Sequence, residues 1–219
     1  MILNKSELAK IVNDMGNRKN VYTCEAQFQF DLADEIRTFL NEKTGVYIVY
    51  VEYPQMIVNR TVHYDIVIES TNVDPHEYCV IELKYKTVAM QNASCYGQPC
   101  TLKTHAAQSL GRYDFYKDIE RIENCSLNTD RHTAKGYAIL LTNDKCYWTK
   151  NGANRLYQAF SLQDRTTISQ GIKSWPTNIK VSSIGNNRNK CISLKNTYNL
   201  NWVQWGNSVN FKYLLLEVK

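Results

Sequence analysis

The stretch that decides the fold runs from residue 78 to residue 86 and reads YCVIELKYK. It is rich in β-branched and aromatic side chains, which predicts a strand. Side chains of a strand alternate between its faces, so Glu82 and Lys84 share one face at a separation of about 6–7 Å. Apolar side chains surround them on both faces, namely those of Tyr78, Val80, Cys79, Ile81, Leu83 and Tyr85. The pattern predicts a central strand that carries an acid and a base.

The preceding strand signal, residues 61–69 (TVHYDIVIE), places Asp65 among apolar neighbours. The segment NVDPHE at 72–77 predicts a turn, so the two strands should form a hairpin. Asp65 and Glu82 on neighbouring strands would repel each other, and a divalent cation would relieve the repulsion by accepting both carboxylates. The alternative is a salt-bridged pair of Glu82 and Lys84 on a solvated face, with Asp65 at a strand end.

A helix predicted for residues 21–42 carries an acid on its apolar stripe. Residues of a helix advance by about 100° each, which places Glu25 within about 20° of Leu32 and Ile36. A carboxylate in that position needs a cation, a hydrogen-bond network or a raised pKa. The alternative is that Glu25 emerges at a frayed helix end or pairs with a structural lysine.

A second helix, predicted within residues 104–123, repeats this feature. Gln108 shares its azimuth, within about 40°, with Arg112 and the apolar residues of the stripe. Gly111 lies beside it and leaves room for another group to approach. The alternative is a glutamine that is satisfied at the rim of the core.

The remaining elements are a helix at 6–15 with Ser6 as its N-cap, strands at 46–53 and 136–143, a polar loop at 91–103, a helix at 153–162 and a C-terminal hairpin. The order of elements predicts an α/β fold with a mixed central β-sheet, a three-stranded meander plus a crossover strand, flanked by helices. We find no repeat or linker. We therefore expect one domain over residues 1–219, with a core at about 21–143 and a C-terminal elaboration at 144–219.

Composition excludes several classes of protein. Hydrophobic residues make up 43% of the 219 residues and charged residues 21%, which excludes intrinsic disorder. The longest apolar runs are too short to span a bilayer, so no membrane partner is expected. The N-terminus lacks a secretory signal, so the expected compartment is the cytoplasm and the seven cysteines are expected to be reduced thiols. The net charge of +5 is compatible with a polyanionic partner.

Together these residues resemble the PD-(D/E)xK superfamily of restriction-endonuclease-like nucleases, and in particular a bacterial subgroup of it. Asp65 matches the Asp of the family motif, and the stretch IELK at 81–84 supplies its Glu and Lys. Glu25 matches the acid of the first core helix, and Gln108 resembles a glutamine of the second. The sequence departs from the family pattern at Tyr64, which replaces the motif's Pro, and at Arg112, where one exonuclease branch has Tyr.

The resemblance implies a nuclease that hydrolyses phosphodiester bonds by attack of a metal-activated water. Asp65, Glu82 and the main-chain carbonyl of Leu83 would hold Mg²⁺ or Mn²⁺, and Glu25 would bind a second ion or orient a metal-bound water. Lys84 would position the water, and Gln108 would contact a phosphate or the site's waters.

Nucleic acid, with DNA favoured, is the partner that the resemblance implies. Arg112, Lys86 and Lys103 would contact its backbone. The sequence leaves open the choice between DNA and RNA, the mode of cutting and a homodimer.

Two other functions compete with this one. The first is a nuclease-like module that binds nucleic acid without turnover. The second is a protein-interaction domain whose contact surface is the C-terminal hairpin, with Tyr198, Trp202 and Trp205.

Overall fold

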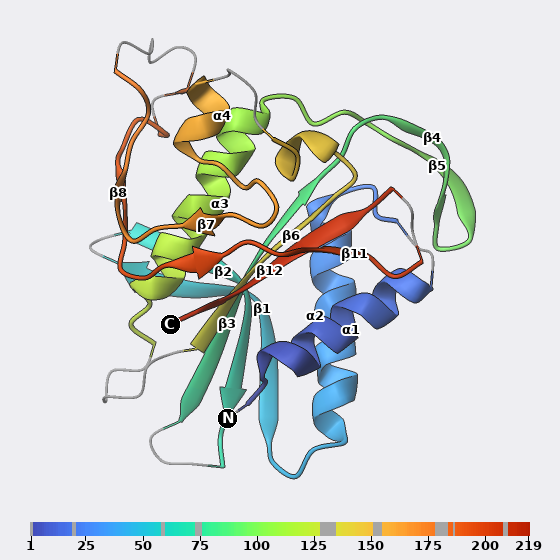
Figure 1. The fold of residues 1–219 in the computed structure, drawn as a ribbon. Helices are drawn as coiled ribbons and strands as arrows, with labels where there is room; N and C mark the ends of the chain where they lie inside the picture. The colour runs from blue at the N-terminus through green and yellow to red at the C-terminus, as the bar shows by residue number, and fades with distance from the viewer. Residues whose placement is uncertain are drawn as a thin grey trace.

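A mixed β-sheet forms the centre of the protein. The computed structural model describes residues 2–18, 21–57, 60–72, 76–127, 135–150, 155–177, 184–185, 187–207 and 210–219. Over these ranges, a six-stranded sheet has the order β1-β2-β3-β6-β12-β11 (Figure 1). Its strands are β1 (Tyr47–Ile57), β2 (Arg60–Ser70), β3 (Glu77–Lys86), β6 (Lys135–Thr142), β12 (Lys212–Val218) and β11 (Trp202–Gln204).

The pairing of the strands confirms the predicted meander and crossover. β1, β2 and β3 pair antiparallel in sequence order, and β3 pairs parallel with β6 through a crossover that contains helix α3 (Gln108–Glu123). β12 then pairs antiparallel with the free edge of β6. Because β6 is covered on both faces, its side chains from Tyr137 to Leu141 are all apolar and buried.

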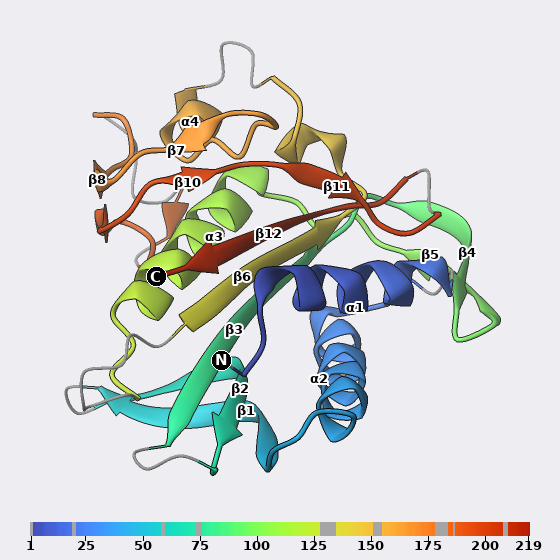
Figure 2. The same cartoon turned by 60° about the horizontal axis from the view of Figure 1, so that its bottom comes forward.

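Helices cover the sheet on both sides (Figure 2). α1 (Lys5–Asn17) and α2 (Glu25–Asn41) pack on one face and share a core with Ile66, Ile81 and Leu83. α3 packs on the other face, over Val67 and Val80.

Both N-terminal helices begin at residues other than those expected. The N-cap of α1 is Asn4 rather than Ser6, because Asn4 and Glu7 form a reciprocal capping box. α2 begins at Glu25 rather than near Val21, because Cys24 has an extended backbone, with φ −152° and ψ 167°, and is the N-cap.

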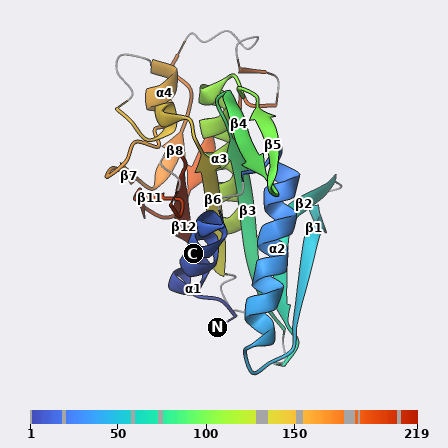
Figure 3. The ribbon, with the colours of Figure 1, turned by 90° about the vertical axis from the view of Figure 1, so that its right-hand side faces the viewer.

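The segment expected to be a polar loop at 91–103 is a β-hairpin, so that prediction was wrong. Strands β4 (Met90–Cys95) and β5 (Gln98–Leu102) meet at a two-residue turn in which Tyr96 and Gly97 both have positive φ, at 50° and 76°. This is the backbone that tight hairpins require. The hairpin lies beside the N-terminal end of α2 (Figure 3).

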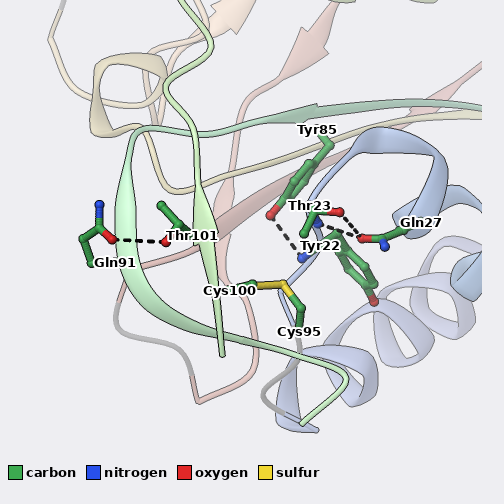
Figure 4. Close-up of a disulfide and its surroundings, with 8 residues drawn as sticks. All are labelled: Tyr22, Thr23, Gln27, Tyr85, Gln91, Cys95, Cys100 and Thr101. Atoms are coloured by element: carbon green, nitrogen blue, oxygen red, sulfur yellow. Dashed lines mark hydrogen bonds between the residues drawn. A yellow bond between two sulfur atoms is a disulfide. The ribbon is translucent and has the colours of Figure 1, made fainter. Parts of the chain in front are cut away.

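A disulfide joins Cys95 to Cys100 within this hairpin (Figure 4). The sequence-based expectation of reduced thiols therefore does not hold for this pair. The hairpin register explains the proximity, because Cys100 lies opposite Ala93 and only two positions along the ladder from Cys95. Their Cα atoms are 5.9 Å apart, within the range that a disulfide spans.

The C-terminal elaboration packs against the outer side of α3. It contains η1 (Lys145–Tyr147), α4 (Arg155–Ala159) and two small sheets, formed by β7 (Thr167–Ile168) with β10 (Tyr198–Asn199) and by β8 (Gly171–Lys173) with β9 (Ile192–Leu194). The helix predicted at 153–162 is thus shorter than expected, and residues 153 and 154 lie outside the described residues. The predicted C-terminal hairpin is present as β11 and β12.

The aromatic residues of this region belong to the core. Tyr198, Trp202 and Trp205 are all buried, and the Trp205 indole donates to the carbonyl of Val12 at 3.0 Å. A contact surface built on these three side chains is therefore wrong for this structure. Among the described residues, no helix combines the length and the hydropathy needed to cross a membrane.

The Glu69 carboxylate connects three side chains near the C-terminal end of β2. Its carboxylate accepts hydrogen bonds from the hydroxyls of Tyr50 at 2.7 Å and Tyr78 at 2.8 Å, and it lies 2.7 Å from the His76 Nδ1. Burial raises the pKa of Glu69, but these hydrogen bonds outweigh burial and hold the pKa below its usual range.

We predict that Glu69→Gln lowers the free energy of unfolding at neutral pH by about 1–3 kcal/mol, because charge-assisted hydrogen bonds are lost. A carboxylate with a lowered folded-state pKa stabilises the fold above its ordinary pKa, and this contribution disappears as the pH falls through the folded-state value. The difference between wild type and variant should therefore shrink on acidification. Urea unfolding across the acid range measures it, and a constant difference would contradict the assignment.

Candidate active site

The site begins where the ladder between β2 and β3 ends. The two strands pair from Ser70 and Glu77 to Ile66 and Ile81, and the next residues are Asp65 and Glu82. Beyond this point the Leu83 N–H donates to the side chain of Asp65, at 2.6 Å from Oδ2, instead of to a backbone carbonyl. Asp65 therefore lies against β3 next to Glu82, as the motif spacing predicts.

Strands β1 and β2 are irregular at the position of Asp65. Val51 and Ile66 pack in the layer of α2, whereas Tyr53 and Tyr64 pack in the layer of α3, so the side-chain alternation of both strands breaks between these pairs. Glu52, at the break in β1, has a φ of 54°, which is uncommon for a residue with a side chain.

Gln29 of α2 hydrogen-bonds to both strands at this irregularity. Its Nε2 donates to the Asp65 carbonyl at 2.7 Å and to the Glu52 Oε1 at 2.8 Å. Gln29 is buried and lies one helical turn after Glu25, on the same stripe. Gln29 was not among the residues predicted from the sequence, although its place on the apolar stripe of α2 is the same signal that identifies Glu25.

Two more backbone N–H groups lie along the edge of β3 that β2 leaves unpaired, and each donates to a side chain. The Tyr85 N–H donates to Glu25 Oε2 at 2.6 Å, and the Thr87 N–H donates to the His105 Nδ1 at 2.9 Å. Asp65, Glu25 and His105 thus bind alternate N–H groups along one edge. Burial and Lys86 lower the pKa of His105, and because its Nδ1 accepts this bond, the neutral ring carries its proton on Nε2.

Lys84 is held from three sides. Its Nζ donates to the Leu83 carbonyl at 2.7 Å, pairs with Asp118 Oδ2 at 2.9 Å and lies 3.9 Å from Glu25 Oε1. Burial lowers the pKa of Lys84, but Asp118, Glu25 and Asp65 outweigh burial and raise it. Lys84 is therefore a protonated ammonium in this structure.

Glu82 is buried and pairs with a residue that the sequence analysis did not identify. Its Oε2 accepts from Arg121 Nη2, and its buried Oε1 has no hydrogen-bond partner among the residues that the structure describes. Burial raises the pKa of Glu82 well above its usual range, Asp118 and Asp65 add to this, and Arg121 and Lys84 oppose it.

Asp118 and Arg121, both of α3, complete the cluster. Arg121 Nη2 lies 3.5 Å from Asp118 Oδ1. Asp118 comes seven residues after Gly111, which places the two within about 20° of each other around the helix. A buried acid on the flank of the apolar stripe was the signal in the sequence that could have found it.

The cluster carries more acid than base. Glu25, Asp65, Glu82 and Asp118 provide four carboxyl groups, against the two cations Lys84 and Arg121. Burial also raises the pKa values of Asp65 and Asp118, although Lys84 opposes the shift in both. Two protons or one divalent cation would balance the remaining charge.

Hard carboxylate oxygens are suitable ligands for Mg²⁺ or Mn²⁺, and the unpartnered Glu82 Oε1 is available to one. The Leu83 carbonyl is occupied by Lys84. Among the residues described, no three His, Cys, Asp or Glu side chains converge on a single point as a ready-made ligand set. The donor chemistry therefore fits a cation at Asp65 and Glu82, with the remaining ligands still to be supplied.

The other sequence-predicted residues do not join this cluster. Gln108 donates to Asp144 Oδ2 at 3.1 Å and accepts from the Tyr157 hydroxyl at 3.2 Å. It lies ten residues before Asp118, about 15 Å away along the helix axis. Its role as a metal-site or phosphate contact gains no support from these contacts.

Arg112 is buried rather than exposed to a nucleic-acid backbone. Its guanidinium donates to the Cys146 carbonyl and lies over the rings of Tyr147 and Tyr157, at 5.4 Å and 4.7 Å from their centroids. Gly111 permits this packing, because a Cβ there would lie 2.3 Å from the Tyr147 hydroxyl. The structure thus differs from the expectation of a phosphate contact at Arg112.

Lys86 and Lys103 remain suitable for such contacts. Lys86 is half-buried and follows Lys84 on the same face of β3, and Lys103 is exposed directly after β5.

Comparisons of the chain with family models, with curated proteins and with solved structures found no match. The observed fold is a mixed α/β fold, and its assignment to the restriction-endonuclease-like group stays a prediction. The interpretation of the site therefore depends on its geometry and on the resemblance of its motif.

We predict that Gln29→Leu destabilises the protein by about 1–3 kcal/mol, because the buried Asp65 carbonyl and the Glu52 carboxylate lose their shared donor. Denaturant unfolding measures the change. Asp34→Asn, an exposed substitution on the same helix, is the control and should stay within about 0.5 kcal/mol of wild type. Equal stability of the two variants would show that the Gln29 bonds do not hold the strand irregularity.

Proposed function

We propose that this protein is a metal-dependent nuclease that hydrolyses phosphodiester bonds of nucleic acid, with DNA as the favoured substrate. The observation that supports this best is the row of side chains at the end of the β2–β3 ladder. There Asp65 binds the backbone beside Glu82, Glu25 binds the next N–H along the edge, and Lys84 lies between them. The motif spacing and the geometry agree.

Asp65 and Glu82 are the residues that would hold Mg²⁺ or Mn²⁺. The ion, when bound, supplies a Lewis acid that lowers the pKa of a water and neutralises charge on the phosphate. The Leu83 carbonyl already accepts a hydrogen bond from the Lys84 Nζ, so only its second lone pair is available to the ion. Glu25 is better placed to orient a water than to bind the same ion, because its Oε2 is already engaged by the Tyr85 N–H.

Lys84 would act as a donor in this reaction. Asp118 and Glu25 keep its Nζ protonated, so it carries a fixed positive charge to the place where negative charge develops on the phosphate. Glu25 Oε1, 3.9 Å from that Nζ, has no hydrogen bond from the backbone and is free to accept a proton from a water.

Lys86 and Lys103 would guide the nucleic-acid backbone toward the site. Contacts of this kind add affinity without choosing a sequence, and they weaken as salt rises. The net charge of +5 agrees with such a partner.

We predict that the purified protein cleaves DNA or RNA only when Mg²⁺ or Mn²⁺ is present. Glu82→Gln and Lys84→Met should each lower the single-turnover rate at least about a hundredfold, because each removes a charge that acts on the transition state. Gel analysis of end-labelled substrates measures the rate. Lys86→Met, on the same strand and face, is the matched control and should weaken binding more than it slows cleavage.

Cleavage that persists in excess chelator would contradict this function. A Glu82→Gln variant as active as wild type would contradict it equally.

A second function is favoured by the internal pairing of the cluster. Arg121 pairs with one oxygen of Glu82, and Lys84 donates to the Leu83 carbonyl, so part of the charge and hydrogen-bonding capacity of these groups is met without an ion. A nuclease-like module that binds nucleic acid without turnover would have this property. Titration calorimetry with Mg²⁺ separates the two, since the module should bind nucleic acid in a salt-dependent way and take up no ion.

A further inference from the structure

The contacts of Glu82 contain a feature that the proposed reaction does not require. A metal ligand of a nuclease needs free oxygens, yet Glu82 Oε2 is paired with Arg121 while Oε1 is buried and unpartnered. The Arg121 side chain is 28% exposed, whereas the Glu82 side chain is 0% exposed. The acid is thus enclosed in the core, whereas the Arg121 side chain is partly exposed, although its Nε is buried.

Arg121 also has a second partner within reach. Its Nη2 lies 3.5 Å from Asp118 Oδ1, and its guanidinium lies over the ring of Tyr64, 5.6 Å from the centroid. Asp118 in turn binds Lys84 through its other oxygen, Oδ2. Asp118 Oδ1 therefore remains available to take up Arg121 fully.

We propose that Arg121 is the internal competitor of the divalent cation at Glu82, and that Asp118 receives its guanidinium when the ion binds. This inference rests on the proposed function, because it concerns the same site. Without an ion, Arg121 compensates the charge of Glu82 and holds its side chain in place. With an ion, the guanidinium moves to Asp118, one turn earlier on α3, and Glu82 gains a free oxygen.

The competition predicts that substitutions of Arg121 and of Asp118 change the Mn²⁺ affinity in opposite directions. Arg121→Gln keeps a hydrogen-bond donor for Glu82 but removes the positive charge, so Mn²⁺ should bind about five- to tenfold more tightly. Arg121→Lys keeps the charge and should bind Mn²⁺ as wild type does. Asp118→Asn removes the alternative partner, so Arg121 stays on Glu82 and Mn²⁺ should bind about fivefold more weakly.

A double substitution tests the link between the two residues. If Asp118 acts by receiving Arg121, the effect of Asp118→Asn on Mn²⁺ affinity should shrink in the Arg121→Gln background. Titration calorimetry with Mn²⁺ alone measures all affinities, with no substrate present. Lys117→Gln is the matched control, because Lys117 belongs to another ion pair of α3, with Glu120, and its substitution should leave the affinity unchanged.

The outcomes separate this inference from the proposed function. If the protein cleaves with metal but Arg121→Gln binds Mn²⁺ no more tightly than wild type, the competition is wrong and the function stands. If Arg121→Gln and Asp118→Asn shift Mn²⁺ affinity in opposite directions but nothing is cleaved, the competition stands and the function is wrong. If no form of the protein binds Mn²⁺, both are wrong.

Discussion

The site depends on one constraint, which is that β3 loses its partner on one edge halfway along its length. β2 leaves after Ile66, while β6 stays paired with the other edge of β3 through Lys86 and Thr142. The backbone N–H groups of β3 that no longer face β2 still need acceptors, because a buried and unpaired N–H costs about 1–3 kcal/mol. Side chains from β2, α2 and the segment before α3 supply those acceptors. The row of functional groups is therefore spaced by the strand repeat itself.

Carboxylates that accept these N–H groups bring negative charge into a buried place, and this charge has to be compensated. An acid that accepts a backbone N–H is held close to the sheet, where burial disfavours its charge. Lys84 and Arg121 compensate this negative charge only in part, since the cluster contains more carboxyl groups than these two cations can neutralise. Buried ion pairs contribute little net stability compared with apolar packing. A cluster with this excess of acid departs from the rule for a stable core, as functional sites do.

Much of this arrangement was predictable from local patterns, and the failures have a common cause. The alternation along residues 78–86 identified both faces of β3, and the helical period identified Glu25. Gln29 has the same period but was missed, because its partners Glu52 and Asp65 lie on β1 and β2, which no pattern within α2 connects to it. Asp118 and Arg121 were missed because their partners lie on β3, 34 or more residues away in sequence, as the Lys84–Asp118 pair shows. Gln108 and Arg112 stood out because they are polar residues on the apolar stripe of α3, and Arg112 is indeed buried. Their partners come from residues 144–157, which no local pattern could connect to α3.

Those partners give the C-terminal elaboration a role in the site. α3 is held by Asp144 at its first residue, by Arg188 at Asp114 and by the Tyr198 hydroxyl at Glu123, its last residue. A helix advances by about 1.5 Å per residue, so a slip of one position would carry Asp118 and Arg121 past the side chains that they bind on β3. The contacts along the outer side of α3 oppose that slip at both ends and in the middle. The elaboration therefore fixes the register of the helix whose inner side pairs with Glu82 and Lys84, although none of those outer contacts involves the strand edge itself.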